Sequence, residues 1–169
     1  MAKVKKIKYA LYVEEDGTIQ VTDPCYDEDV WCRVELKNAL PGWYDATVGY
    51  AQDGYISSLT VTHQGGYSNY PLNTPEHSIG VDAALAGFYS HKPNIDKQED
   101  WQKLVDQLYG PGWETRGPVV KVHIHADREK NFGLSGITVN SGYGDGAYPV
   151  YVAKNSANQI VRARIRFIW

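Results

Sequence analysis

The stretch YPVYVAKNSANQIVRARIRFIW, residues 148–169, decides the fold class of this 169-residue chain. Its second half alternates apolar residues with arginines, in the order Val161, Arg162, Ala163, Arg164, Ile165, Arg166, Phe167. A period of two is typical of a β-strand with one buried face and one wet face. The polar run at residues 155–158 separates this strand from the apolar run before it. The stretch therefore predicts an antiparallel hairpin.

The same alternation recurs along the chain. Residues 42–63, GWYDATVGYAQDGYISSLTVTH, predict a second hairpin, with Gln52, Asp53 and Gly54 as its turn. Near the N-terminus an EEDG turn separates one strand-like run from TIQVTD, which predicts a third hairpin. The first of these runs is expected to place four residues on one face, opposite Lys6 and Lys8: Ile7, Tyr9, Leu11 and Val13. Residues 118–127, PVVKVHIHAD, predict a further strand.

One segment has helical spacing instead. Within residues 94–110, NIDKQEDWQKLVDQLYG, the apolar residues recur every three or four positions, Asp96 can cap the start, and Gly110 follows the end. Residues 64–75, QGGYSNYPLNTP, show no period and are expected to form a loop. The sequence thus predicts a mainly β fold, an antiparallel sandwich or partly closed barrel with one amphipathic helix at about 96–109, as a single domain over residues 1–169.

Composition excludes several classes of protein. The chain has 17 basic and 20 acidic residues, a net charge of −3, whereas a dedicated binder of nucleic-acid polymers is usually basic. No apolar run has the length of a membrane span, and the N-terminal apolar run is too short for a signal peptide. We therefore expect a cytoplasmic protein. Cys25 and Cys32 are expected to be free buried thiols.

Basic residues line one face of three predicted strands. They are Lys6 and Lys8 on the first, Lys121, His123 and His125 on the second, and Arg162, Arg164 and Arg166 on the last. If these strands lie side by side, they make a positive surface that attracts phosphate or carboxylate groups. The alternative is a solvated outer face whose charges are met by acids on neighbouring strands.

The glycine-rich stretch SGYGDGAY, residues 141–148, is a second candidate site. Alternating glycines allow a ligand or another chain to approach the backbone closely, and Asp145 between Tyr143 and Tyr148 could accept hydrogen bonds or ligate a cation. The alternative is a tight turn that uses glycine for its positive φ.

Three blocks of the chain resemble the signatures of a domain-of-unknown-function family found in bacteria and their phages. Residues 141–168, SGYGDGAYPVYVAKNSANQIVRARIRFI, are similar to an SGxGDGxYxV pattern followed by a turn and a final strand. Residues 79–90, IGVDAALAGFYS, resemble a VDxGxxGFxD pattern, and residues 21–26, VTDPCY, resemble an earlier DP motif. The chain departs from the second pattern at Ala84, where glycine is expected, and at Ser90, where an acid is expected. The resemblance implies a mostly β fold, a location in a bacterial cell or a phage-infected host, and no established activity.

The resemblance also suggests that Asp23, Asp82 and Asp145, the acids of the three blocks, converge. Converging carboxylates can bind a hard cation or hydrogen-bond the hydroxyls of a sugar. In the alternative interpretation they brace the backbone of neighbouring turns.

These observations lead to one preferred function and two alternatives. We expect a non-enzymatic module, without a cofactor, that binds a small anionic or nucleotide-like ligand. The ligand-binding residues are expected to be Asp23, Tyr67, Tyr70, Asp82, Trp113, Tyr143, Asp145, Tyr148, Arg162 and Arg164. One alternative is a metal-dependent hydrolase that uses the three acids or the pair His123 and His125. The other is a structural or protein-interaction module that forms an oligomer through an edge strand.

Overall fold

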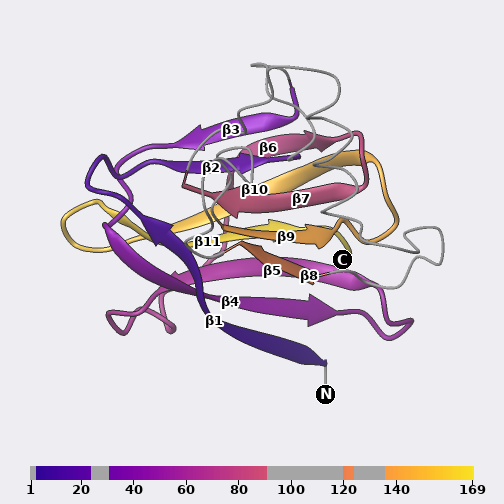
Figure 1. The fold of residues 1–169 in the computed structure, drawn as a ribbon, viewed down its shortest axis with the longest axis horizontal. Coiled ribbons are helices and arrows are strands. Elements are labelled where there is room, and N and C mark those ends of the chain that lie inside the picture. Colours follow the sequence, from indigo (N-terminus) through magenta and orange to yellow (C-terminus); the bar gives the residue numbers. More distant parts are fainter. Residues whose placement is uncertain (1–2, 24–30, 91–119, 124–135) are drawn as a thin grey trace.

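The structure is a computed structural model that describes residues 3–23, 31–90 and 136–169, together with the backbone of residues 120–123. These residues form antiparallel strands (Figure 1). The strands are β1 Val4–Val13, β2 Ile19–Thr22, β3 Arg33–Leu36, β4 Gly42–Tyr50, β5 Ile56–His63, β6 Pro75–Val81, β7 Leu85–Tyr89, β8 Val120–His123, β9 Gly136–Asn140, β10 Gly146–Lys154 and β11 Ile160–Arg166.

The strands make two open sheets. One has the order β1-β4-β5-β11-β10-β6 and the other β3-β2-β7-β9-β8. Figure 1 shows β1, β4 and β5 at the lower margin of the view and β3, β2 and β6 at the upper one. The prediction of a mainly β, antiparallel fold is confirmed, and the described part forms open sheets rather than a closed barrel. The helix predicted at about 96–109 lies outside the described residues.

Both sheets contribute to one hydrophobic core. Val48, Leu59 and Ile165 come from the six-stranded sheet, Val21 and Phe88 from the other, and all are fully buried. Along the strands of the six-stranded sheet every second residue faces this core. The residues between them lie on the outer face of the sheet. Within the described ranges no helix has the length and apolar character that a membrane span requires.

The two later hairpins are confirmed. Strand β10 pairs with β11, with Val150 opposite Ile165, and β4 pairs with β5, with Val48 opposite Leu59. In the C-terminal turn the carboxamide oxygen of Asn155 accepts the backbone N–H groups of residues 157 and 159 at 3.0 and 2.9 Å. The polar run between the two strands therefore stabilises the turn that the sequence predicts.

The predicted N-terminal hairpin is wrong. Strand β1 pairs with β4, whereas β2 pairs with β3 and β7 in the other sheet. The turn itself forms, since the Gly17 N–H donates to the Glu14 carbonyl at 3.0 Å, but it carries the chain from one sheet to the other. All four residues of β2 are buried, which is the pattern of an interior strand rather than of a hairpin arm with a wet face.

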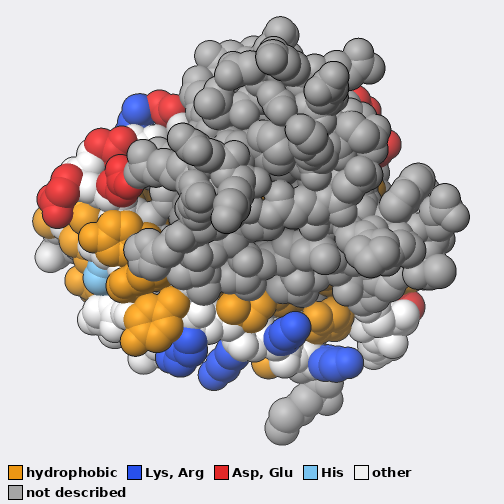
Figure 2. All heavy atoms as spheres, viewed as in Figure 1, with side chains coloured by type: hydrophobic (Ala, Val, Ile, Leu, Met, Phe, Trp, Pro, Cys, Tyr) orange, Lys and Arg blue, Asp and Glu red, His pale blue; other side chains and the backbone are white. Residues whose placement is uncertain are grey.

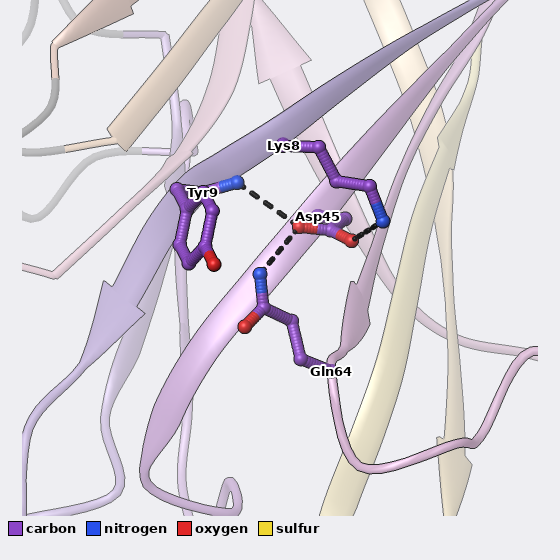
Figure 3. Close-up of polar contacts among 4 residues, drawn as sticks. All are labelled: Lys8, Tyr9, Asp45 and Gln64. Carbon is purple, nitrogen blue, oxygen red and sulfur yellow. Dashed lines mark hydrogen bonds and ion pairs between the residues drawn. The ribbon is translucent and has the colours of Figure 1, made fainter.

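A β-bulge interrupts β1. The register with β4 shifts between Ile7 and Leu11, and Tyr9 adopts a positive φ of 52°. Tyr9 is consequently 51 % exposed, although Leu11 is buried, so the prediction that the two share a face is wrong. Figure 3 shows how Asp45 holds the bulge: its carboxylate accepts the Tyr9 N–H at 3.0 Å, Lys8 Nζ at 2.8 Å and Gln64 Nε2 at 2.7 Å.

Candidate functional site

A row of arginines lies on the outer face of the six-stranded sheet. Arg162, Arg164 and Arg166 alternate with core residues along β11, an interior strand, and each is partly buried. On β5 the residues directly opposite are Thr62, Thr60 and Ser58. The row therefore lies in the middle of a sheet face and not at an exposed margin.

Threonine hydroxyls hold two of these guanidinium groups. Arg162 Nε donates to Thr62 Oγ1 at 3.2 Å, and Arg164 Nε donates to Thr60 Oγ1 at 2.9 Å. The Nη groups of Arg164 have no hydrogen-bond partner in the described part of the chain. Because its Nε is already fixed, the planar head of Arg164 presents its remaining donors in a defined orientation.

The loop after β5 closes over one end of the row. Arg162 Nη1 donates to the carbonyl oxygen of Tyr70. The Tyr70 ring packs against Tyr67 with the centroids 5.3 Å apart, and Tyr67 packs against His63 at 5.8 Å. Of the predicted ligand-binding residues, the structure thus brings Tyr67, Tyr70, Arg162 and Arg164 together.

The electrostatic environment of the row favours an anion. Partial burial lowers the pKa of Arg162 and Arg164, and the neighbouring arginine charge lowers each of them further. Within residues 3–23, 31–90 and 136–169, no carboxylate forms an ion pair with these two side chains. Arginine stays charged under these conditions, so like charges stand close together in a partly desolvated place. A bound anion would offset that repulsion.

At the end of β11 the third arginine is engaged differently. The Arg166 guanidinium lies over the indole of Trp169, with its central carbon 4.3 Å from the ring centroid, and its Nε donates to the Ile168 carbonyl at 3.3 Å. Trp169 is 82 % exposed. Arg166 therefore extends the positive row and adds an aromatic surface at its end.

The three basic strands do not lie side by side. Strands β4 and β5 separate β1 from β11, and β8 belongs to the other sheet, next to β9. The continuous surface that the sequence suggested is therefore wrong. The positive row on β11 arises from one strand. Its neighbours are Thr62, Thr60 and Ser58 on β5 and, on β10, Tyr151 opposite Arg164 and Ala153 opposite Arg162, rather than more basic residues.

The three family acids do converge, as the resemblance suggested. Asp23 is fully buried, and its Oδ2 accepts the backbone N–H groups of Asp82 and Ala83 at 2.9 and 2.7 Å. Asp145 Oδ1 accepts the next N–H, that of Ala84, at 2.9 Å. Two carboxylates thus bind three consecutive N–H groups of the turn between β6 and β7, where Ala84 has a φ of +53°.

This arrangement supports the bracing interpretation. A run of backbone N–H groups is an anion-binding device, and here the anions are the chain's own carboxylates. Cys32, a free buried thiol, lies beside them: burial raises its pKa to about 11, and the charges of Asp23, Asp82 and Asp145 add to that effect. The described residues contain no group of three His, Cys, Asp or Glu side chains arranged to hold a metal ion.

The remaining predicted site residues lie elsewhere. The Tyr143 hydroxyl donates to Asp53 Oδ2 at 2.6 Å, at the tip of the β4–β5 hairpin. The Tyr148 hydroxyl donates to the Gly144 carbonyl at 2.6 Å and so closes its own turn. Trp113 and His125 lie outside the described residues. The structure therefore divides the predicted site into an arginine row with two loop tyrosines, a braced acidic turn, and a separate tyrosine at a hairpin tip.

Thr60 and Thr62 are site residues that the sequence analysis missed. They stand out only once β5 is known to pair with β11, because register alone places them opposite the arginines. The alternation of LTVTH would have shown that both threonines share one face of their strand. It could not have shown which strand lies beside that face.

Comparison with known proteins adds a family but no activity. Neither the comparison with curated proteins nor that with solved structures gives a significant match. Residues 19–165 match the family model described as "Protein of unknown function (DUF4241)", and this range includes both the braced acidic turn and the arginine row up to Ile165. The chain belongs to the DUF4241 family.

Proposed function

We propose that this protein is a non-enzymatic binding module for a small anionic ligand, which it holds on the outer face of the six-stranded sheet. The arginine row carries the proposal, because Arg162 and Arg164 are partly buried, hydrogen-bonded to threonine, and not neutralised by a carboxylate of the described part. An arginine whose stem only covers apolar surface keeps its charged head in water. In Arg162 and Arg164 threonine hydroxyls hold the head on the sheet face instead. Such fixed donors suit phosphate or carboxylate groups.

The tyrosines beside the row favour a ligand that carries a ring. Tyr67 and Tyr70 are both partly exposed, and the Tyr70 carbonyl already contacts Arg162. A ligand whose anionic group binds Arg164 could place a planar ring against Tyr67. This combination supports a nucleotide-like ligand, in line with the expected sequestration of such a molecule. A bacterial or phage origin and a cytoplasmic location remain parts of this proposal.

Isothermal titration calorimetry against a panel of linear and cyclic nucleotides, with inorganic pyrophosphate as the simplest probe, tests the proposal. We expect at least one member to bind, and its affinity to fall as salt is added. The substitution Arg164→Gln should weaken that binding by about 10- to 100-fold, which corresponds to the loss of one charge-assisted hydrogen bond.

The matched control is Lys37→Gln. It also removes one positive charge, but from the end of the edge strand β3 in the other sheet, where Lys37 pairs with Glu35. We expect its affinity to stay within about twofold of the parent protein. The proposal is refuted if the parent protein binds no member of the panel. It is also refuted if the two variants lose the same amount of affinity.

A further inference from the structure

The N-terminal half of β1 is an open sheet edge. Strand β1 ends the six-stranded sheet, and among the strands that the structure describes it pairs with β4 alone. The Lys3 carbonyl accepts the Tyr50 N–H at 3.0 Å, so it points toward β4. Backbone groups alternate in direction along an antiparallel strand, so those of Val4 and Lys6 point away from the sheet. No strand within residues 3–23, 31–90 and 136–169 pairs with them on that side, so they can bind one more strand.

The side chains of this edge combine positive charge with exposed apolar surface. Lys3, Lys5, Lys6 and Lys8 are all exposed. Of the seven large hydrophobic residues that are exposed in the described part, three belong to this strand: Val4, Tyr9 and Tyr12. Figure 2 shows lysine or arginine side chains beside hydrophobic ones along the lower margin, where β1 lies in Figure 1.

The bulge adds an aromatic cluster at the end of this open segment. The rings of Tyr9 and Tyr12 both pack edge-to-face on Trp43, with centroid distances of 5.3 and 5.1 Å. A positive φ at a tyrosine costs about 1–2 kcal/mol, and Asp45 holds the residue in that conformation by accepting its N–H. The fold thus keeps an aromatic side chain exposed where a regular strand would have buried it.

Lysines and a bulge can also protect an edge from unwanted pairing. Protection alone does not account for the exposed Val4, Tyr9 and Tyr12, because apolar side chains on an edge promote association. A second copy of the chain is a poor partner, since antiparallel pairing of two β1 strands would place lysines against lysines. The charge of the edge calls for an acidic partner.

We propose that β1 is a docking edge for an extended acidic segment of a partner protein. The segment adds as a further strand beside Val4–Lys8, and its backbone hydrogen-bonds the outward groups of Val4 and Lys6. Its carboxylates face Lys5 and Lys6, whereas Lys8 is already paired with Asp45. An apolar side chain at its end packs on Tyr9 and Trp43. This surface lies on a different strand from the arginine row, so the two proposals are tested separately.

The probe is a fluorescein-labelled peptide of alternating glutamate and valine, about eight residues long to match the open edge. Fluorescence anisotropy should show saturable binding that weakens with salt. Lys6→Pro removes an outward N–H without breaking the ladder to β4, and should weaken binding by about 10-fold or more. Lys5→Glu combined with Lys6→Glu should do the same through charge.

The control is Lys37→Glu combined with Lys154→Glu, which changes the net charge equally at sites away from β1 and should leave peptide affinity within about twofold. Circular dichroism checks that Lys6→Pro keeps the strand content. Absence of peptide binding overturns the proposal. Binding that responds to charge reversal but not to proline also overturns it, since that is simple electrostatic attraction. Binding of phosphatidylserine vesicles without binding of the peptide would overturn it in favour of a membrane surface. A molecular mass in solution that doubles as the protein concentration rises would overturn it in favour of a second copy of the chain.

Discussion

The substitution Tyr44→Phe tests how the two hairpins are joined. Tyr44 lies on β4, is fully buried, and its hydroxyl stands 2.9 Å from both the Leu40 and the Ile160 carbonyl oxygens. The Ile160 carbonyl also accepts the Leu40 N–H at 2.9 Å, so it keeps a partner when the hydroxyl is removed. The Leu40 carbonyl then loses its hydrogen bond from the hydroxyl. We expect the free energy of unfolding to fall by about 1–3 kcal/mol.

Urea unfolding at neutral pH, followed by circular dichroism, measures this loss. The matched control is Tyr50→Phe, a partly buried tyrosine of the same strand whose ring lies under the Lys3 ammonium and whose hydroxyl makes no hydrogen bond in the described part. The control should cost less than about 0.5 kcal/mol. Equal values for the two variants would contradict the role assigned to the Tyr44 hydroxyl.

The pH dependence supplies an independent check on Tyr44. Burial raises its pKa well above the ordinary value near 10, so the folded state stays protonated where the unfolded state ionises. Stability from this group is fully present below pH about 10 and falls above it, by up to about 1.4 kcal/mol per pH unit. Tyr44→Phe lacks this loss, so the gap between variant and parent should shrink between pH about 10 and 11. A constant gap would refute the assignment.

Three further predictions concern the core, the bulge and the thiol. In Gly136→Ala the new Cβ would stand 2.0 Å from the Phe88 carbonyl oxygen, so we expect a loss of about 3 kcal/mol in urea unfolding. Partial burial alone would raise the pKa of Asp45, but hydrogen bonds from Lys8 and other donors lower it overall. The stability that Asp45 contributes is therefore present above pH about 4 and is lost as the pH falls through the lowered pKa. In Asp45→Asn the free energy of unfolding, measured between pH about 5 and 2, should depend less on pH than in the parent protein. Burial raises the pKa of Cys32 to about 11, so at pH about 8 few of these thiols are ionised. Iodoacetamide should therefore modify Cys32 at least about 10-fold more slowly in the folded than in the urea-unfolded protein, as measured by peptide mass spectrometry. Equal rates would contradict its burial.

Strands with a clear alternation of apolar and polar residues were predictable, and the pairing of strands was predictable only where a short turn joins them. The hairpins β4–β5 and β10–β11 followed from alternation around a polar turn, because both arms are close in sequence. The turn at residues 14–17 carries the same signal, yet it links two sheets. A turn motif reverses the chain, but burial of the following strand decides which strand becomes its neighbour.

The candidate site was predictable in part, for a similar reason. Arg162 and Arg164 share a face by strand geometry alone, so the sequence sufficed to place them together. The convergence of Asp23 and Asp145 on the turn at residues 82–84 followed only from the resemblance to a family. The partners of the arginines, Thr60 and Thr62, depend on the contact between β5 and β11, which joins residues about 100 positions apart.

Strands β3, β6, β7 and β9 were not predicted from the sequence. By itself the sequence did determine both arms of the hairpins β4–β5 and β10–β11, and that three arginines of the last strand point the same way. These are consequences of the two-residue period, and they hold whatever lies beside the strand. Only the tertiary structure decided that β1 leaves its apparent partner for β4, that a bulge turns Tyr9 outward, and that threonines fix the arginines. A period of two is satisfied equally by many neighbours, so the choice among them falls to the packing of the whole core.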